Sequence, residues 1–116
     1  MPRIPTLWAL MALLPIATGC HSTRRGEPIT GPMRISDPQV ERGRVVFLRN
    51  CHQCHPGGEA GLGPALNNKP APVFLMKTQV RVGLGAMPSF SKEQISPEDI
   101  DSLMAYVIAL RKADRS

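Results

Sequence analysis

The chain has 116 residues, of which 42% are hydrophobic and 20% charged, and its formal net charge is +5. This length allows one small domain. The composition is too apolar for a disordered protein, and three cysteines are too few for a disulfide scaffold. Because the chain has only one Trp, one Tyr and three Phe, a domain of this size needs an added element to fill its core.

The first 19 residues are predicted to be a secretory signal peptide. Arg3 provides a positive start, residues 4–16 are mostly apolar, and small residues follow at 17–19. The apolar segment is too short to cross the ~30 Å of membrane hydrocarbon comfortably as a helix. A short buried helix is the alternative, but the order of charged, apolar and small residues favours export.

Cys20 follows Ala17-Thr18-Gly19, which resembles the lipobox of bacterial lipoproteins, where a small residue precedes the lipidated cysteine. Ordinary signal cleavage at the same place is the alternative, and it would leave an unpaired thiol in an oxidising compartment. Lipidation is the more economical hypothesis. It predicts a protein anchored at the periplasmic face of a bacterial membrane, where no nucleic acid is met. Residues 20–36, rich in Pro, Gly, Ser and Thr, then form a flexible tether.

Residues 37–113 are predicted to form an all-α domain, followed by a short tail at 114–116. The first helix has Asp37 as its N-cap and Pro38 at its first position, and it leads directly into Cys51. No segment alternates between apolar and polar residues as a strand does. Glycine-rich loops, at 57–64 and 83–88, connect the helices.

Two further helices are predicted. The second runs from about Pro72 to Val82 and has apolar residues at helical spacing. The third begins after Ser96, which is placed to cap it, and it ends near Arg111 and Lys112, whose charges suit a helix C-terminus. The apolar face of this third helix is expected to consist of Ile100, Leu103, Met104, Val107 and Ile108.

Residues 51–55 have the pattern C-x-x-C-H, the attachment signature of c-type haem. The thiols of Cys51 and Cys54 can form thioethers with two vinyl groups on one porphyrin edge, and His55 then supplies an imidazole nitrogen to the iron. His52 is interpreted as a variable position of the motif.

The C-x-x-C-H pattern has three alternatives to haem attachment. A redox disulfide would need a βαβ setting, and a zinc site would need a second ligand pair, for which only His21 and His52 remain. The third alternative, a chance match, is weakened by the export signal, because haem is attached to such proteins outside the cytoplasm.

With this motif the chain resembles the class I c-type cytochromes over about residues 37–113. The resemblance implies a small cytochrome c fold, in which the N- and C-terminal helices cross closely and loops enclose one covalently bound haem c. At the crossing, it implies that Gly43 and Phe47 of the first helix face Leu103 and Tyr106 of the last.

The loop residues extend the resemblance. Pro64, in Gly63-Pro64-Ala65-Leu66, is implied to accept the Nδ1–H of His55 with its carbonyl oxygen. Met87 in Met87-Pro88 matches the distal methionine of the family.

Met87 is also indicated by its own surroundings. The preceding Gly83-Leu84-Gly85-Ala86 allows the backbone to approach a flat ligand, and Pro88 stiffens the exit. The alternative is a loop methionine that packs on the core. Met76 and Met104 have core spacing and are interpreted as plain apolar residues.

His55 and Met87 together would fill both axial positions of the iron, leaving no open site for a small-molecule substrate. The sequence therefore predicts an electron carrier, not an enzyme, whose partners are redox proteins such as an oxidase, a reductase or a dehydrogenase. The alternatives are a ligand-binding or peroxidatic haem protein, and a bound cytochrome subunit of a larger oxidoreductase. The arginines of the first helix are interpreted as a solvated face, with docking on an acidic partner as the alternative: Arg42, Arg44 and Arg49.

Overall fold

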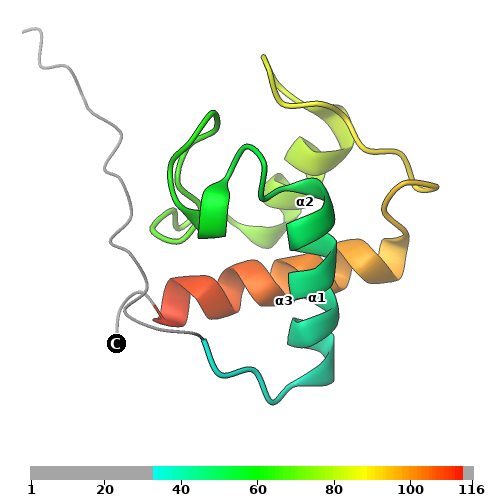
Figure 1. Cartoon of the computed structure of the whole chain (residues 1–116). Helices are drawn as coiled ribbons and strands as arrows, with labels where there is room; N and C mark the ends of the chain where they lie inside the picture. The colour runs from blue at the N-terminus through cyan, green and yellow to red at the C-terminus, as the bar shows by residue number, and fades with distance from the viewer. Residues whose placement is uncertain (1–32, 114–116) are drawn as a thin grey trace, which may run out of the picture.

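A computed structural model describes residues 33–113, in which the order of elements is α1 (Pro38–Asn50), the short 3₁₀ helix η2 (Pro56–Gly58), α2 (Val73–Val82) and α3 (Pro97–Ala113) (Figure 1). Within this range the only β-type pairing is an isolated bridge between Leu84 and Met87. The all-α prediction is therefore confirmed. No helix of the described range is long and apolar enough to span a membrane. Cys20, the predicted signal peptide and the tail at 114–116 lie outside the described residues.

Helix α1 begins and ends as local sequence signals predict. The Asp37 side chain accepts a hydrogen bond from the Gln39 backbone N–H at 2.8 Å, and Pro38 occupies the first turn. At the other end, the backbone N–H groups of Cys51 and His52 both donate to the Phe47 carbonyl oxygen, at 2.8 and 3.0 Å. The helix thus ends at the first residue of the C-x-x-C-H motif.

Helix α3 confirms both its predicted cap and its predicted apolar face. The backbone N–H of Asp99 donates to Ser96 Oγ at 3.1 Å, which stabilises the first turn. Ile108 is half-buried at the margin of the apolar face. The other four members of this face are buried: Ile100, Leu103, Met104 and Val107.

The crossing of α1 and α3 requires a glycine (Figure 1). A Cβ at position 43 would lie 1.9 Å from the Ser102 carbonyl oxygen and 2.8 Å from Tyr106 Cβ, so any side chain would push the helices apart. Next to this contact, the ring centroids of Phe47 and Tyr106 are 5.3 Å apart, and Leu103 is buried in the same core. The expected partners are present, and the structure adds Ser102 as the backbone contact of Gly43.

Two arginines of α1 form ion pairs on the surface. Arg42 Nε lies 2.7 Å from an oxygen of Asp99 at the start of α3, and Arg44 Nε lies 2.8 Å from Glu41 Oε2 within α1. Each guanidinium is therefore already paired with a carboxylate of the same chain. Pairs this exposed contribute little to stability.

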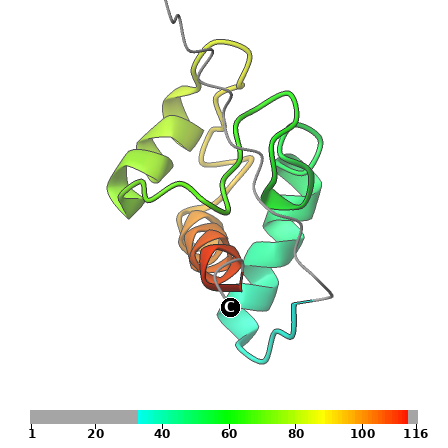
Figure 2. The same cartoon turned by 90° about the vertical axis from the view of Figure 1, so that its left-hand side faces the viewer.

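Helix α2 has the predicted position, with Pro72 as its N-cap and Gly83 at its C-terminus. It buries only a narrow strip, in which Val80 is 7% exposed, whereas Phe74 on the outer face is 71% exposed. In Figure 2, α2 and the segment that contains η2 stand on opposite sides above the C-terminal end of α3. Side chains from α2 and from the segment around η2 line one cavity.

The core extends slightly upstream of the predicted domain start. Met33 and Ile35, which the sequence assigns to the tether, are partly buried against the core. The core itself comes mainly from α1 and α3, with one residue from α2 and one from the loop before α3: Val46, Phe47, Val80, Ile95, Ile100, Leu103, Met104, Tyr106, Val107 and Leu110.

Candidate functional site

The C-x-x-C-H motif forms a tight turn immediately after α1. The backbone N–H groups of Cys54 and His55 donate to the Cys51 carbonyl oxygen at 3.1 and 2.9 Å, which brings the three side chains to one region. Burial raises the pKa of the Cys51 thiol to about 11, with a smaller contribution from Cys54. This direction is opposite to that of activated thiols in redox C-x-x-C motifs, whose pKa is lowered. The redox-disulfide alternative also lacks its βαβ setting, because the described residues form helices and a single isolated bridge.

The His55 ring is buried and held by a hydrogen bond. His55 Nδ1 lies 2.8 Å from the Pro64 carbonyl oxygen, the contact that the family resemblance implies. A carbonyl oxygen can only accept, so Nδ1 carries a proton, and in the neutral tautomer Nε2 is then the nitrogen whose lone pair can bind a metal. A bond of this kind fixes the orientation of a ligating imidazole and raises its basicity.

Gly63 leaves room for the His55 ring. A Cβ at position 63 would lie 2.2 Å from His55 Cε1, so a side chain there would displace either the ring or the loop. The same loop is attached to the motif, because the Gly63 N–H donates to the Cys54 carbonyl oxygen at 2.9 Å.

We expect Gly63→Ala to disturb the iron ligand field without removing the cofactor. If His55 binds a haem iron, as the sequence predicts, displacement of the imidazole should weaken that bond and give a partly high-spin absorption spectrum with an unchanged haem-to-protein ratio. Gly57→Ala is the matched control, because no atom lies within 4 Å of a Cβ at that position, although its φ of +62° makes the substitution mildly strained. A low-spin spectrum of Gly63→Ala identical to that of the unmutated protein would contradict this role.

Met87 lies on a tight hairpin after α2. The backbones of Leu84 and Met87 exchange two hydrogen bonds, of 3.2 and 3.0 Å. Gly83, with φ of +71°, makes this turn possible, since a Cβ there would lie 2.6 Å from the Met87 carbonyl oxygen. The Met87 sulfur accepts a contact from Gln79 Nε2 at 3.8 Å.

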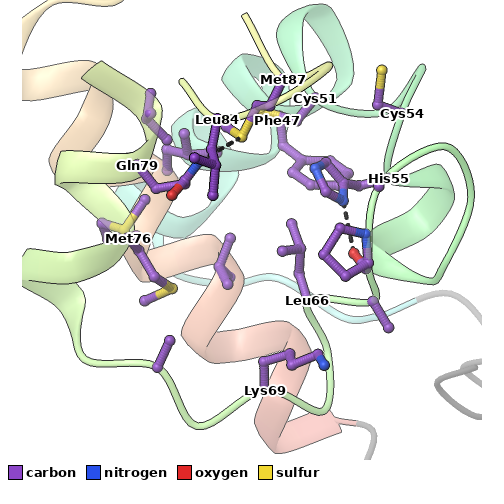
Figure 3. A pocket seen from close by; sticks show the side chains of 18 of the residues that line it. Phe47, Cys51, Cys54, His55, Leu66, Lys69, Met76, Gln79, Leu84 and Met87 are labelled. Carbon is purple, nitrogen blue, oxygen red and sulfur yellow. Dashed lines mark hydrogen bonds between the residues drawn. The ribbon is translucent and has the colours of Figure 1, made fainter. Parts of the chain in front are cut away.

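These segments surround a mostly apolar cavity of about 550 Å³, within the size range of small-molecule and cofactor pockets. In Figure 3, His55 and Leu66 form one side, and Met76, Gln79 and the Met87 sulfur form the other. The two cysteines lie at one end, and Lys69 lies at the opposite end. The structure thus brings together the predicted residues Cys51, Cys54, His55, Pro64 and Met87.

Several cavity residues were not predicted. Met76 and Met104, expected to be plain core residues, also line the cavity. Arg111 was expected only to suit the C-terminus of α3 by its charge, and the structure shows that it is buried, with 7% exposed. Its guanidinium donates to the carbonyl oxygens of Leu66 and Ala71, at 3.0 and 3.1 Å, and its Nη2 lies 3.0 Å from Met76 Sδ. These contacts draw the side chain inward, because they satisfy its donors inside the protein.

The cavity residues fit a haem c group. A haem is flat and largely apolar, as the walls are, and it bears carboxylates at the edge away from the vinyl groups. Lys69 and Arg111 are the formally charged side chains among the lining residues, and both are cationic. Cys51 and Cys54 would hold the vinyl edge, and His55 would face the iron. Among residues 33–113, no group of three or more His, Cys, Asp or Glu side chains could hold a metal ion.

The chain matches the family described as "Cytochrome C oxidase, cbb3-type, subunit III" over residues 38–107. The chain is a class I monohaem c-type cytochrome. The match covers α1, the C-x-x-C-H motif, α2 and most of α3, and it confirms the small cytochrome c fold.

The chain is also similar to proteins that are named as cytochromes. It is 37% identical to cytochrome c6 of Bryopsis maxima over 78 residues, covering 59% of this chain and 88% of the relative. It is 38% identical to cytochrome c6 of Gloeothece citriformis over 81 residues, covering 63% and 71% of the two chains. The "4-cresol dehydrogenase [hydroxylating] cytochrome c subunit" of Pseudomonas putida is 31% identical over 75 residues, covering 65% and 66%. No solved structure gives a significant match.

Membership in this family confirms the main predictions of function. The cytochrome carries one covalently bound haem c with its iron, and it is an electron-transfer protein and not an enzyme. Its partners are therefore other redox proteins. The zinc and chance interpretations of the C-x-x-C-H motif are set aside.

Proposed function

We propose that the protein carries a single electron on a haem c attached through Cys51 and Cys54, with His55 and Met87 as the axial ligands of the iron. One observation carries the proposal: His55 and the Met87 sulfur line opposite sides of the cavity, whose cysteine end can hold the vinyl edge (Figure 3). Pro64 orients His55 through the hydrogen bond to Nδ1.

The haem iron, when bound, supplies a one-electron couple. Met87 provides a thioether sulfur, a soft ligand that favours the ferrous state and raises the reduction potential. The apolar walls exclude water from the iron. Leu62 and Leu84 line the cavity but are 86% and 74% exposed, so parts of the cavity wall lie at the protein surface, where a partner can approach the haem edge.

Protein-film voltammetry tests this function. A carrier with both axial positions filled should give one reversible one-electron wave that hydrogen peroxide leaves unchanged. A catalytic current on addition of peroxide would instead support the peroxidatic alternative.

A bound subunit of a larger oxidoreductase is the second candidate. The relationship to a dehydrogenase cytochrome subunit favours it. Gel filtration of the protein isolated from its native membranes in mild detergent separates the two functions. A free carrier should elute as a monomer, whereas a subunit should elute with its enzyme and retain substrate-dependent haem reduction.

We further propose that the protein is exported to the periplasmic face of a bacterial membrane and held there by lipid on Cys20. In this organisation, residues 1–19 are the signal peptide, 20–36 the tether, 37–113 the cytochrome domain and 114–116 the tail. The order of Arg3, the apolar residues 4–16 and the small residues before Cys20 supports it.

Cys20→Ser should release a fully haem-loaded protein into the soluble periplasmic fraction, because the acyl chains that bind it to the membrane can no longer be attached. The measurement is the haem-stained distribution between membrane and soluble fractions, with Ser22→Ala as the control that keeps Cys20. Equal membrane retention of Cys20→Ser would point to docking on a membrane partner instead.

A further inference from the structure

The segment that connects Met87 to α3 is attached to α2 by one arginine. Arg81, in the last turn of α2, directs Nη1 at three backbone carbonyl oxygens: Phe90 at 3.2 Å, Ser91 at 2.9 Å and Ile95 at 2.7 Å. The segment follows the yellow hairpin and leads into the orange start of α3 in Figure 1. A charged donor shared among carbonyls of one segment fixes the position of that segment.

The three carbonyls converge because the chain turns at this point. The Ile95 N–H donates to the Ser91 carbonyl oxygen at 3.0 Å, and the Ser91 N–H donates to Gln94 Oε1 at 2.8 Å. Ile95 itself is 1% exposed. Without Arg81, the carbonyl oxygen of this buried residue would lose a charged donor, and part-buried carbonyls without a donor are costly.

Met87 lies between two attachments to the same helix. Before it, the Leu84–Met87 hairpin leaves the C-terminal end of α2. After it, the Phe90 N–H donates to the Val80 carbonyl oxygen at 2.9 Å, and Arg81 holds the next residues. The position of the Met87 backbone relative to α2 is therefore fixed on both sides, and the Arg81 contacts make up most of the second attachment.

We propose that Arg81 is a positioning residue for the sixth iron ligand: it holds the segment after Met87 against α2, so that the Met87 sulfur stays on the ferric iron. The proposal rests on the proposed role of Met87. The ferric state depends most on such support, because the soft thioether binds the harder Fe(III) less well than Fe(II). Arg81 itself does not line the cavity, so it acts only through the loop.

Imidazole competition measures how readily the Met87 sulfur leaves the ferric iron. Imidazole binds only when the sixth position opens, so its apparent affinity is proportional to the open fraction. Arg81→Gln should raise this affinity about tenfold, the change expected when the hydrogen bonds of one charged donor are lost. Arg81→Lys keeps the charge on a shorter side chain that reaches the three carbonyl oxygens less well, so its imidazole affinity should lie between those of Arg81→Gln and the unmutated protein.

Two control variants separate positioning from general stability. Val46→Ala removes buried volume in α1 away from the cavity, and Arg42→Gln removes a surface arginine paired with Asp99. Val46→Ala should melt earlier than the unmutated protein, and Arg42→Gln should melt at nearly the same temperature, because so exposed an ion pair contributes little to stability. Both should bind imidazole with unchanged affinity. If Val46→Ala raised the imidazole affinity as much as Arg81→Gln at equal loss of thermal stability, the specific role of Arg81 would be overturned.

The experiment distinguishes failure of this inference from failure of the proposed function. If the unmutated ferric protein lacks the sulfur–iron absorption band at the red end of the spectrum, Met87 is not the ligand. The proposed function and the role of Arg81 are then both wrong. If the band is present and Arg81→Gln binds imidazole no more tightly than the unmutated protein, only the role of Arg81 is overturned. Should Arg81→Gln fail to fold, Arg81→Lys supplies the same comparison.

Discussion

Replacing both Cys51 and Cys54 with alanine should yield a largely unfolded chain without covalent haem. The cofactor would be missing from a mostly apolar cavity of about 550 Å³, so the residues that line it would lose their packing contacts and meet water instead. Small domains are stable by only ~5–15 kcal/mol. The core from α1 and α3 therefore cannot hold the loops and α2 in place alone.

Intact mass and far-UV circular dichroism measure the two parts of this result. The unmutated protein should exceed its polypeptide mass by one haem that acid–acetone does not extract, whereas the variant should show neither added mass nor a cooperative melt. Gln53→Ala, between the two cysteines, is the matched control and should retain both. A native dichroism spectrum and cooperative melting of the haem-free variant would show that the cofactor is not part of the core.

The second large effect is expected from Met87→Ala. Removing the thioether should abolish the sulfur–iron band of the ferric protein, lower the reduction potential and open the ferrous iron to CO. Absorption spectra and a redox titration measure all three. The loop itself should keep its shape, because the Leu84–Met87 hydrogen bonds involve only backbone atoms.

Met104→Ala is the control for this effect. Met104 also lines the cavity but is 4% exposed on α3, so its truncation should cost roughly 2–5 kcal/mol of stability while the band persists. Met76→Ala should likewise keep the band. A band that survives in Met87→Ala and disappears in Met76→Ala would assign the sulfur to α2 instead of to the loop.

The helices and the motif could be predicted because their signals are local. Asp37 and Ser96 cap α1 and α3 with bonds that span only two or three residues, and C-x-x-C-H forms its turn with neighbouring carbonyls. Such contacts depend on the order of residues along the chain and not on how distant segments meet.

The contacts of Arg111 beside the cavity could not be predicted in the same way. Arg111 finds its acceptors in Leu66 and Ala71, more than a third of the chain away, and no local pattern specifies that meeting. One signal was available: Arg111 continues the spacing of Met104 and Val107 on the buried face of α3, and a cation on such a face needs internal partners.

The contacts that position the loop around Met87 could not be predicted from the sequence either. Gln79 and Arg81 look like ordinary polar positions of α2, and only the folded chain brings one to the Met87 sulfur and the other to the carbonyls after it. Glycines at 63 and 83 were visible as loop residues, but the ring or carbonyl that each must avoid becomes clear only in three dimensions.

Exposure of the unmutated ferrous protein to CO tests the central claim most directly. If His55 and Met87 occupy both axial positions, the spectrum should remain that of a six-coordinate low-spin haem, and CO should bind slowly and weakly. Rapid formation of a full CO complex would show an open iron, and it would contradict the assignment of Met87 and the closed site of an electron carrier.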